Sequence, residues 1–171
     1  NLLDEDPSIG LVLSDVKMPQ LDGYDFFRVV AHRYPKLPVV LMTGYPIEDL
    51  ALRPSFVEAS RAAVTELAAE LVAEGLGDLT VVVGFLDRIE GATDEVGRPR
   101  GAPQNAAAVL HAGAQVARYA KHHLPNYGVF DEFRYFVPGT DTCIVRVRGI
   151  DVALAICEDL WQDGGPVAAY A

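Results

Sequence analysis

The chain contains few sulfur-containing residues and few basic ones. Among its 171 residues are 2 cysteines, 2 methionines and 1 tryptophan, and 24 acidic residues outnumber 14 basic ones, giving a net charge of −10. The two cysteines, Cys143 and Cys157, lie too far apart for a metal-ligand spacing and are too few for a disulfide scaffold. The negative charge argues against nucleic acid and anionic membranes as partners, because phosphate repels such a surface.

Long hydrophobic runs are also absent. No apolar run is long enough to cross a bilayer, and the acidic start, residues 1–6, does not resemble a signal peptide. Half of the residues are nevertheless hydrophobic, which is typical of a globular domain with one core. We therefore expect a cytoplasmic protein with reduced thiols. Because the chain does not begin with Met, we expect it to be an excised or truncated piece.

The first half of the chain reads as alternating strands and helices. Apolar runs at residues 11–16 and 38–42 predict two strands, and the helical spacing of apolar residues at 24–33 predicts a helix between them. Such a β–α–β unit normally forms a right-handed parallel crossover. Pro54 then begins a predicted long helix over residues 54–73, which is rich in Ala, Glu and Leu. These patterns predict an α/β fold.

The second half reads as strands and hairpins. Residues 80–86 form a β-branched strand, followed by a polar Gly/Pro loop at 90–103. Strands at 106–111 and 115–119 flank Ala112-Gly113-Ala114, and strands at 143–148 and 152–156 flank Gly149-Ile150-Asp151. Both arrangements predict hairpins.

Cys157 is the most informative residue for chemistry. It follows the apolar run 152–156 and precedes the acidic segment 158–161, so it is predicted to lie where a buried strand turns into a helix. The first amides of such a helix can hold a thiolate and a developing oxyanion. A dense polar segment at 121–132 begins with Lys121. Together these features indicate a cysteine nucleophile beside a fixed cation.

From about residue 43 to residue 171 the chain resembles the nitrilase, or carbon–nitrogen hydrolase, superfamily. The nearest likeness is to the glutaminase domain of bacterial glutamine-dependent NAD synthetases. The motifs that carry it are residues 43–50, 53–57, 103–106, 119–136 and 156–161. The resemblance implies a nitrilase-like sandwich of sheets and helices, incomplete here because such domains continue well past the cysteine. It also implies glutamine as substrate, with no cofactor and no metal, and it allows a homo-oligomer.

The same resemblance assigns roles to individual residues. It implies Cys157 as the nucleophile, Lys121 as the cation that stabilises the tetrahedral intermediate, Glu132 as the acid that orients this lysine, and Tyr127 as a residue near the glutamine pocket. The family's general base is a glutamate, and Val39 stands at its position in the motif. Valine cannot move a proton, and loss of a general base typically costs about 10²–10⁴ in rate. We therefore expect weak or no hydrolysis.

Residues 1–44 resemble the middle of a response-regulator receiver domain instead. The motifs are residues 13–19, 21–23 and 38–44. This resemblance implies a receiver-like β–α–β unit in which Asp15 is the phosphoacceptor and Thr43 the switch hydroxyl of a phosphorelay. The acidic pair that binds magnesium and the lysine that a receiver also needs are missing from the matching region. We therefore expect a chimera of a receiver-like segment, residues 1–44, with a C-terminally truncated glutaminase domain, residues 45–171.

Several conspicuous residues have structural interpretations. Adjacent histidines such as His122 and His123 point to different sides and lack a carboxylate spacing, so we expect no metal site there. Cys143 fits a core strand. Three functions stay open: a weak or inactive glutaminase, a phosphorelay receiver, and a hybrid fragment without a native function.

Overall fold

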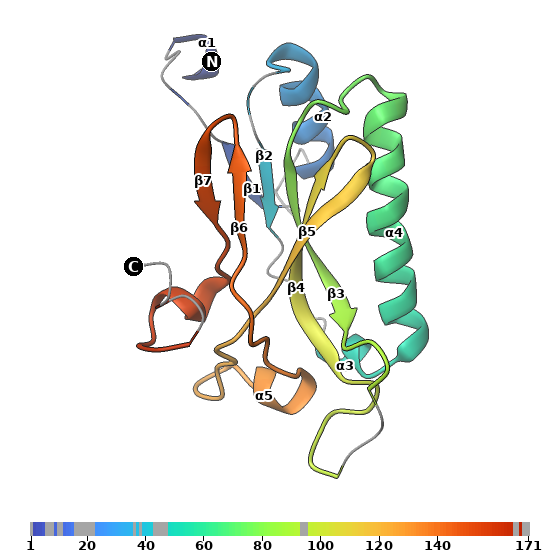
Figure 1. Cartoon of the computed structure of the whole chain (residues 1–171), viewed down its shortest axis with the longest axis vertical. Helices are drawn as coiled ribbons and strands as arrows, with labels where there is room; N and C mark the ends of the chain where they lie inside the picture. The colour runs from blue at the N-terminus through green and yellow to red at the C-terminus, as the bar shows by residue number, and fades with distance from the viewer. Residues whose placement is uncertain are drawn as a thin grey trace.

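The computed structural model describes residues 2–5, 9, 12–15, 23–35, 37, 39–42, 48–92, 96–165 and 168. Its elements are α1 (Leu2–Glu5), β1 (Val12–Asp15), α2 (Gly23–Arg33), β2 (Val39–Met42), α3 (Glu48–Ala51), α4 (Pro54–Ala73), β3 (Val81–Arg88), β4 (Pro103–His111), β5 (Ala114–Ala120), α5 (Glu132–Tyr135), β6 (Ile144–Val147), β7 (Ile150–Ala153) and the 3-10 helix η1 (Cys157–Leu160). Helix α4 lies along one side of the main sheet, and the β6–β7 hairpin lies on the other side (Figure 1).

The predicted β–α–β unit is present as β1, α2 and β2. Strands β1 and β2 are parallel, with Asp15 opposite Met42. Strand β2 is also parallel to β3, with Val40 opposite Val82. The β1–α2–β2 unit and the later strands are therefore joined in one five-stranded sheet of order β1-β2-β3-β4-β5.

Strands β3, β4 and β5 form an antiparallel meander. The β4–β5 connection is the predicted hairpin, but its loop has only two residues because His111 pairs with Ala114. Both loop residues have positive φ angles, +50° at Ala112 and +81° at Gly113. This combination is typical of a type I′ turn, whose twist matches that of the two strands. The sheet thus combines parallel and antiparallel pairs, giving a mixed α/β fold.

The larger core lies between the sheet and the helices. Val64, Ala68 and Leu71 of α4 pack with Val81 and Val83 of β3. The helix spans the predicted residues, with Pro54 in its first turn as expected. Val30 of α2 and Val39 of β2 belong to the same cluster, and both are 2% exposed.

A second, smaller core lies on the opposite face of the sheet. It joins Val109 and Tyr119 to Cys143 and Leu154, which flank the β6–β7 hairpin. The prediction that Cys143 is a core residue is confirmed, although the residue precedes β6 instead of lying within a strand. This second face is the one on which the candidate site is built.

The predicted strand leading into Cys157 is wrong. Strand β7 ends at Ala153, its four residues are exposed, and residues 154–156 are not in a strand. The turn is the reason: Arg148 and Gly149 have φ angles of +50° and +85°, and they form a two-residue loop that pairs Val147 with Ile150. Strand β6 begins at Ile144, opposite Ala153, so β7 ends there, and after it Leu154 still donates a backbone hydrogen bond, to Cys143.

No helix within the described part of the chain is long and apolar enough to cross a membrane.

Candidate active site

Cys157 lies on a backbone elbow with a conformation that is rare for residues with a side chain. Its φ angle is +49°, in the left-handed region. Such residues cost about 1–3 kcal/mol and cluster at functional sites. The residue is exposed. The helix that follows is a single 3-10 turn, so its dipole is smaller than the expected α-helix would provide.

Lys121 is the buried cation of the site. It directly follows β5 and is 1% exposed. Its ammonium donates to both carboxylate oxygens of Glu132, at 2.8 and 2.9 Å. Its backbone N–H donates to the carbonyl of Asn105, and its carbonyl accepts from Gly139, both at 2.8 Å. The charge-assisted bonds to Glu132 hold the ammonium, because such bonds are short and strong, and the two backbone bonds hold the main chain of Lys121. The structure thus brings the predicted pair Lys121 and Glu132 together.

Glu158 is a buried carboxylate that the sequence analysis did not single out. It follows Cys157 directly and is 6% exposed. The hydroxyl of Tyr127 donates to both of its oxygens at 2.8 Å, and the side-chain amide of Gln162 donates at 2.8 Å. The signal that could have identified it is the acidic pair immediately after the candidate nucleophile.

Neighbouring groups shift the pKa values of Glu158 and Tyr127. Hydrogen bonds from Gln162 and Tyr127, together with the nearby positive charge of Lys121, lower the pKa of Glu158 below its usual range. The hydrogen bond to Glu158 raises the pKa of Tyr127, and burial and the nearby Cys157 raise it further. Lys121 thus favours the charged form of Glu158, whereas Cys157 disfavours the charged form of Tyr127.

Asp159 ties the elbow to the end of β5. It is 1% exposed. Its carboxylate accepts hydrogen bonds from the side chain of Tyr119 and from the backbone N–H groups of His122, His123 and Ile156. This second buried carboxylate of η1 was also not singled out from the sequence.

Val39 lies on the other face of the sheet. It packs in the core beneath α2 and α4 with Val30 and Val64. Side chains alternate between the two faces of a strand, and Tyr119, two residues before Lys121, packs in the core of the opposite face. Val39, which the resemblance predicts to stand at the position of the family's base, therefore points into the core beneath α2 and α4 and not toward the face on which Tyr119 packs.

The two residues predicted for a phosphorelay, Asp15 and Thr43, are described only in part or not at all. Asp15 is the last residue of β1, at the carboxyl end of the strand, and its side chain is not described. Thr43 lies outside the described residues. In the described part of the chain no group of histidine, cysteine and acidic side chains is arranged to hold a metal ion. The ring of His122 instead contacts the carbonyl of Gly139 at 2.6 Å.

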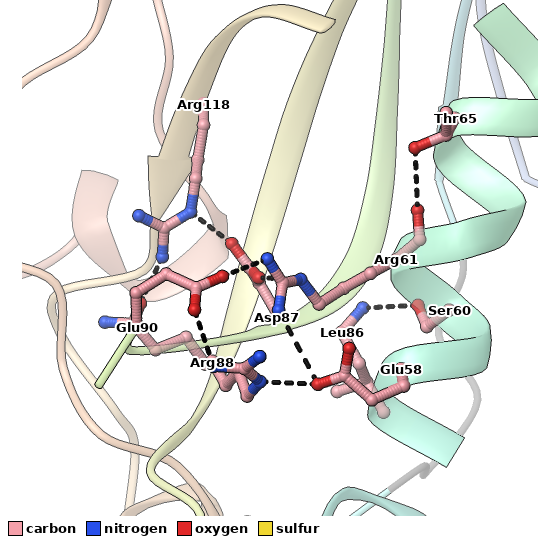
Figure 2. A network of polar contacts seen from close by, with 10 residues as sticks. Glu58, Ser60, Arg61, Thr65, Leu86, Asp87, Arg88, Glu90 and Arg118 are labelled. Atoms are coloured by element: carbon pink, nitrogen blue, oxygen red, sulfur yellow. Dashed lines mark hydrogen bonds and ion pairs between the residues drawn. The ribbon is translucent and has the colours of Figure 1, made fainter. Parts of the chain in front are cut away.

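A second polar cluster lies on the helix side of the sheet. Asp87, 5% exposed, forms ion pairs with Arg61 of α4 and Arg118 of β5, and Glu58 and Glu90 complete the network with Arg88 (Figure 2). The cluster borders a cavity of about 1140 Å³. The described residues that line this cavity include neither Cys157 nor Lys121, so the two polar centres are separate. Arg61 and Glu58 of α4 pair with Asp87 and Arg88 of β3, so the cluster joins the helix to the sheet.

Comparisons with known proteins agree with the described fold. No protein-family model matches the chain. The chain is 41% identical over 134 residues to the glutamine-dependent NAD(+) synthetase of Thermotoga maritima, covering 78% of this chain and 21% of that protein. It is 40% identical over 129 residues to the enzyme of that name from Xanthomonas campestris pv. campestris, covering 72% and 20%.

Two solved structures share the fold. The glutamine-dependent NAD+ synthetase from Acinetobacter baumannii in complex with ADP matches with a TM-score of 0.63 and 31% identity, over 79% of this chain and 24% of that chain. A carbon–nitrogen hydrolase from Helicobacter pylori G27 matches with a TM-score of 0.55 and 20% identity, over 81% and 45%.

The solved structures identify the fold of the chain, and the sequence relatives identify the group of enzymes that it resembles. The chain has the mixed α/β, nitrilase-like fold that is also found in a carbon–nitrogen hydrolase. In sequence it is similar to glutamine-dependent NAD(+) synthetases, and it spans about a fifth of the length of these curated relatives. The predicted resemblance to glutamine-dependent NAD synthetases is confirmed at this level, whereas its bounds, residues 43–171, and the receiver-like resemblance of residues 1–44 stay predictions.

Proposed function

We propose that the chain carries the site of a nitrilase-type glutamine amidohydrolase, in which Cys157 attacks the side-chain amide of glutamine. The observation that carries the proposal is the exposed thiol on a left-handed elbow, next to a carboxylate whose pKa is lowered partly by the buried ammonium of Lys121. The names of the relatives support glutamine as the substrate.

The proposed reaction proceeds in two steps. The Cys157 thiol loses its proton to water, the thiolate forms a carbon–sulfur bond to the amide carbonyl, and the carbon–nitrogen bond breaks as the nitrogen takes up an equivalent proton from water and leaves as ammonia. Water then attacks the resulting glutamyl thioester, releasing glutamate and restoring the thiol. Each attack places negative charge on the carbonyl oxygen. Lys121 supplies a fixed positive charge for this oxyanion, and Glu132 keeps the ammonium in place.

Glu158 and Tyr127 suit recognition of the polar end of glutamine. Glu158 is ionised at neutral pH because its pKa is lowered, and it directly follows Cys157 in the chain. An ionised, partly desolvated carboxylate attracts a cation, and the α-ammonium of glutamine is one. Tyr127 holds this carboxylate in position through its hydroxyl. We therefore assign Glu158 to the ammonium group and Tyr127 to the support of Glu158.

The proposed enzyme is slow because its general base is weak or missing. The lowered pKa of Glu158 makes it a poor proton acceptor. Val39 carries no titratable group and packs in the opposite core. We expect turnover to be about 10²–10⁴ below that of an otherwise equal site with a positioned base. In the whole protein, we propose that the released ammonia supplies NAD(+) synthesis.

Release of ammonia from glutamine tests this function. We expect a low rate in the unaltered chain, no rate above background in Cys157→Ala, and the unaltered rate in Cys143→Ala, because Cys143 lies in the core between the sheet and the β6–β7 hairpin. The matched pair of cysteine variants separates loss of the nucleophile from loss of a thiol. An equal rate in Cys157→Ala and the unaltered chain would refute the proposal, and so would a rate that is fast without any base.

A further inference from the structure

Asp159 accepts four hydrogen bonds although it is almost completely buried. One carboxylate oxygen accepts from the backbone N–H groups of His122 and His123, at 3.1 and 2.7 Å. The other accepts from the hydroxyl of Tyr119 at 2.7 Å and from the backbone N–H of Ile156 at 3.2 Å. A buried carboxylate that leaves these positions would strand four donors, so its place is tightly determined.

The four donors come from two segments that are far apart in sequence. Tyr119, His122 and His123 flank Lys121 on both sides, whereas Ile156 immediately precedes Cys157. The separations in sequence from Asp159 are 40, 37 and 36 residues on one side and 3 on the other. A single side chain therefore joins the backbone that carries the ammonium to the backbone that carries the thiol.

We propose that Asp159 is the positioning residue that fixes the Cys157 thiol against the Lys121 ammonium. This inference rests on the proposed function and concerns the geometry of the same site. The backbone of Cys157 is in a left-handed conformation that a residue with a side chain adopts only when its surroundings hold it there. The hydrogen bond from the backbone N–H of Ile156 to the Asp159 carboxylate restrains the backbone at the residue just before Cys157. Asp159 does not touch the reacting atoms, so it acts through the two residues that it aligns.

A proximity reagent tests this alignment without requiring turnover. One molecule of o-phthalaldehyde joins a thiol and a neighbouring amine into a fluorescent isoindole, with loss of two waters. We would measure the initial rate of isoindole formation and map the bridge by peptide mass spectrometry. In the unaltered chain we expect a bridge between Cys157 and Lys121. The matched variants are Asp159→Asn and Asp87→Asn, which each neutralise a buried aspartate, one at the site and one in the separate arginine cluster.

Asp159→Asn keeps the shape of the side chain but turns one acceptor oxygen into a donor. At least one backbone N–H then faces an N–H group, and the two segments shift apart. Because a misplacement of about 1 Å can cost up to about 10² in rate, we expect bridging to slow by about fivefold or more in Asp159→Asn. We expect an unchanged rate in Asp87→Asn. A purely structural role would instead lower the stability of both variants and slow bridging in neither.

The outcomes separate the inference from the function on which it rests. A chain in which Cys157 is bridged to another amine, and not to Lys121, refutes the thiol–ammonium pair and with it the proposed function. A bridge that forms equally fast in the unaltered chain and in folded Asp159→Asn refutes only the positioning role. If Asp159→Asn does not fold, Tyr119→Phe decides, because it removes one of the four donors and leaves the carboxylate. Slower bridging in Tyr119→Phe supports the role, and an unchanged rate overturns it.

Discussion

A glutamate introduced at Val39 would not restore a general base. The sequence motif makes Val39→Glu the obvious repair, but the side chain at this position is 2% exposed in the core beneath α2 and α4. The pairing of the strands gives the distance between Val39 and Ala120, the residue before Lys121. Val39 is level with Val81 of β3, whereas Ala120 is level with Phe85, four residues further along. With three strand spacings of about 4.8 Å and a rise of about 3.3 Å per residue, Ala120 lies roughly 20 Å from Val39.

The introduced carboxyl group would therefore be buried without a partner. Removing the valine side chain from the core costs about 1.5–3 kcal/mol, and burying an unpaired carboxyl group costs about 1–3 kcal/mol. We expect the free energy of unfolding of Val39→Glu to fall by about 3–5 kcal/mol, a large part of the total stability of a typical domain. Burial raises the pKa of such a carboxyl group in the folded state, so the loss is smallest at acidic pH and grows as the pH rises through that pKa.

Urea denaturation at acidic and neutral pH, combined with an ammonia-release assay, measures both consequences. Val29→Glu is the matched control, because Val29 is 56% exposed on α2 and should tolerate the same substitution. We expect no gain of glutamine hydrolysis in either variant. The reasoning would be wrong if Val39→Glu retained normal stability and gained hydrolysis that Cys157→Ala removes.

Two further predictions concern a close backbone contact and an exposed ion pair. A methyl group on Gly139 would lie 2.2 Å from the carbonyl oxygen of Ala120. We therefore expect Gly139→Ala to lower the free energy of unfolding by about 1–3 kcal/mol in urea denaturation, and an unchanged value would contradict this contact. The hydrogen bond from Arg88 lowers the pKa of Glu58, so this pair stabilises the fold above the ordinary carboxyl pKa and stops doing so at acidic pH. Arg88→Met should be less stable than the unaltered chain at neutral pH, and this difference should vanish on acidification; a difference that persists in acid would refute the assignment.

Local sequence signals were sufficient for the two long helices, α2 and α4, and for the parallel unit, but not for the short helices α1, α3 and α5. Pro54 marks the first turn of α4, and the chain order β1, α2, β2 is observed as predicted. The bounds of the two hairpin turns could not be predicted equally well from the sequence. Ala112 and Arg148 adopt positive φ angles, although neither residue type favours them. Their two-residue turns are imposed by the pairing of the flanking strands, and this is why the predicted bounds around Cys157 were wrong.

The site was predictable only in part for a related reason. Lys121 and Glu132 are joined across an irregular segment without periodicity, so only a motif could connect them in advance. The face on which Val39 lies could not be inferred, because residues 39–42 form an uninterrupted apolar run without alternation. Glu158 and Asp159 were visible as an acidic pair, but their different roles follow from burial and donors that only the three-dimensional structure supplies.

The central claim is that Cys157 forms a covalent thioester with glutamine, and trapping this intermediate tests it most directly. The chain would be incubated with excess glutamine, quenched with acid at successive times, and digested for peptide mass spectrometry. Cys143, buried in the second core, serves as the control thiol in the same molecule. We predict a glutamyl adduct that accumulates on Cys157 and not on Cys143, because hydrolysis of the thioester also lacks an efficient base. Absence of any adduct on Cys157, or equal labelling of both cysteines, would contradict the account.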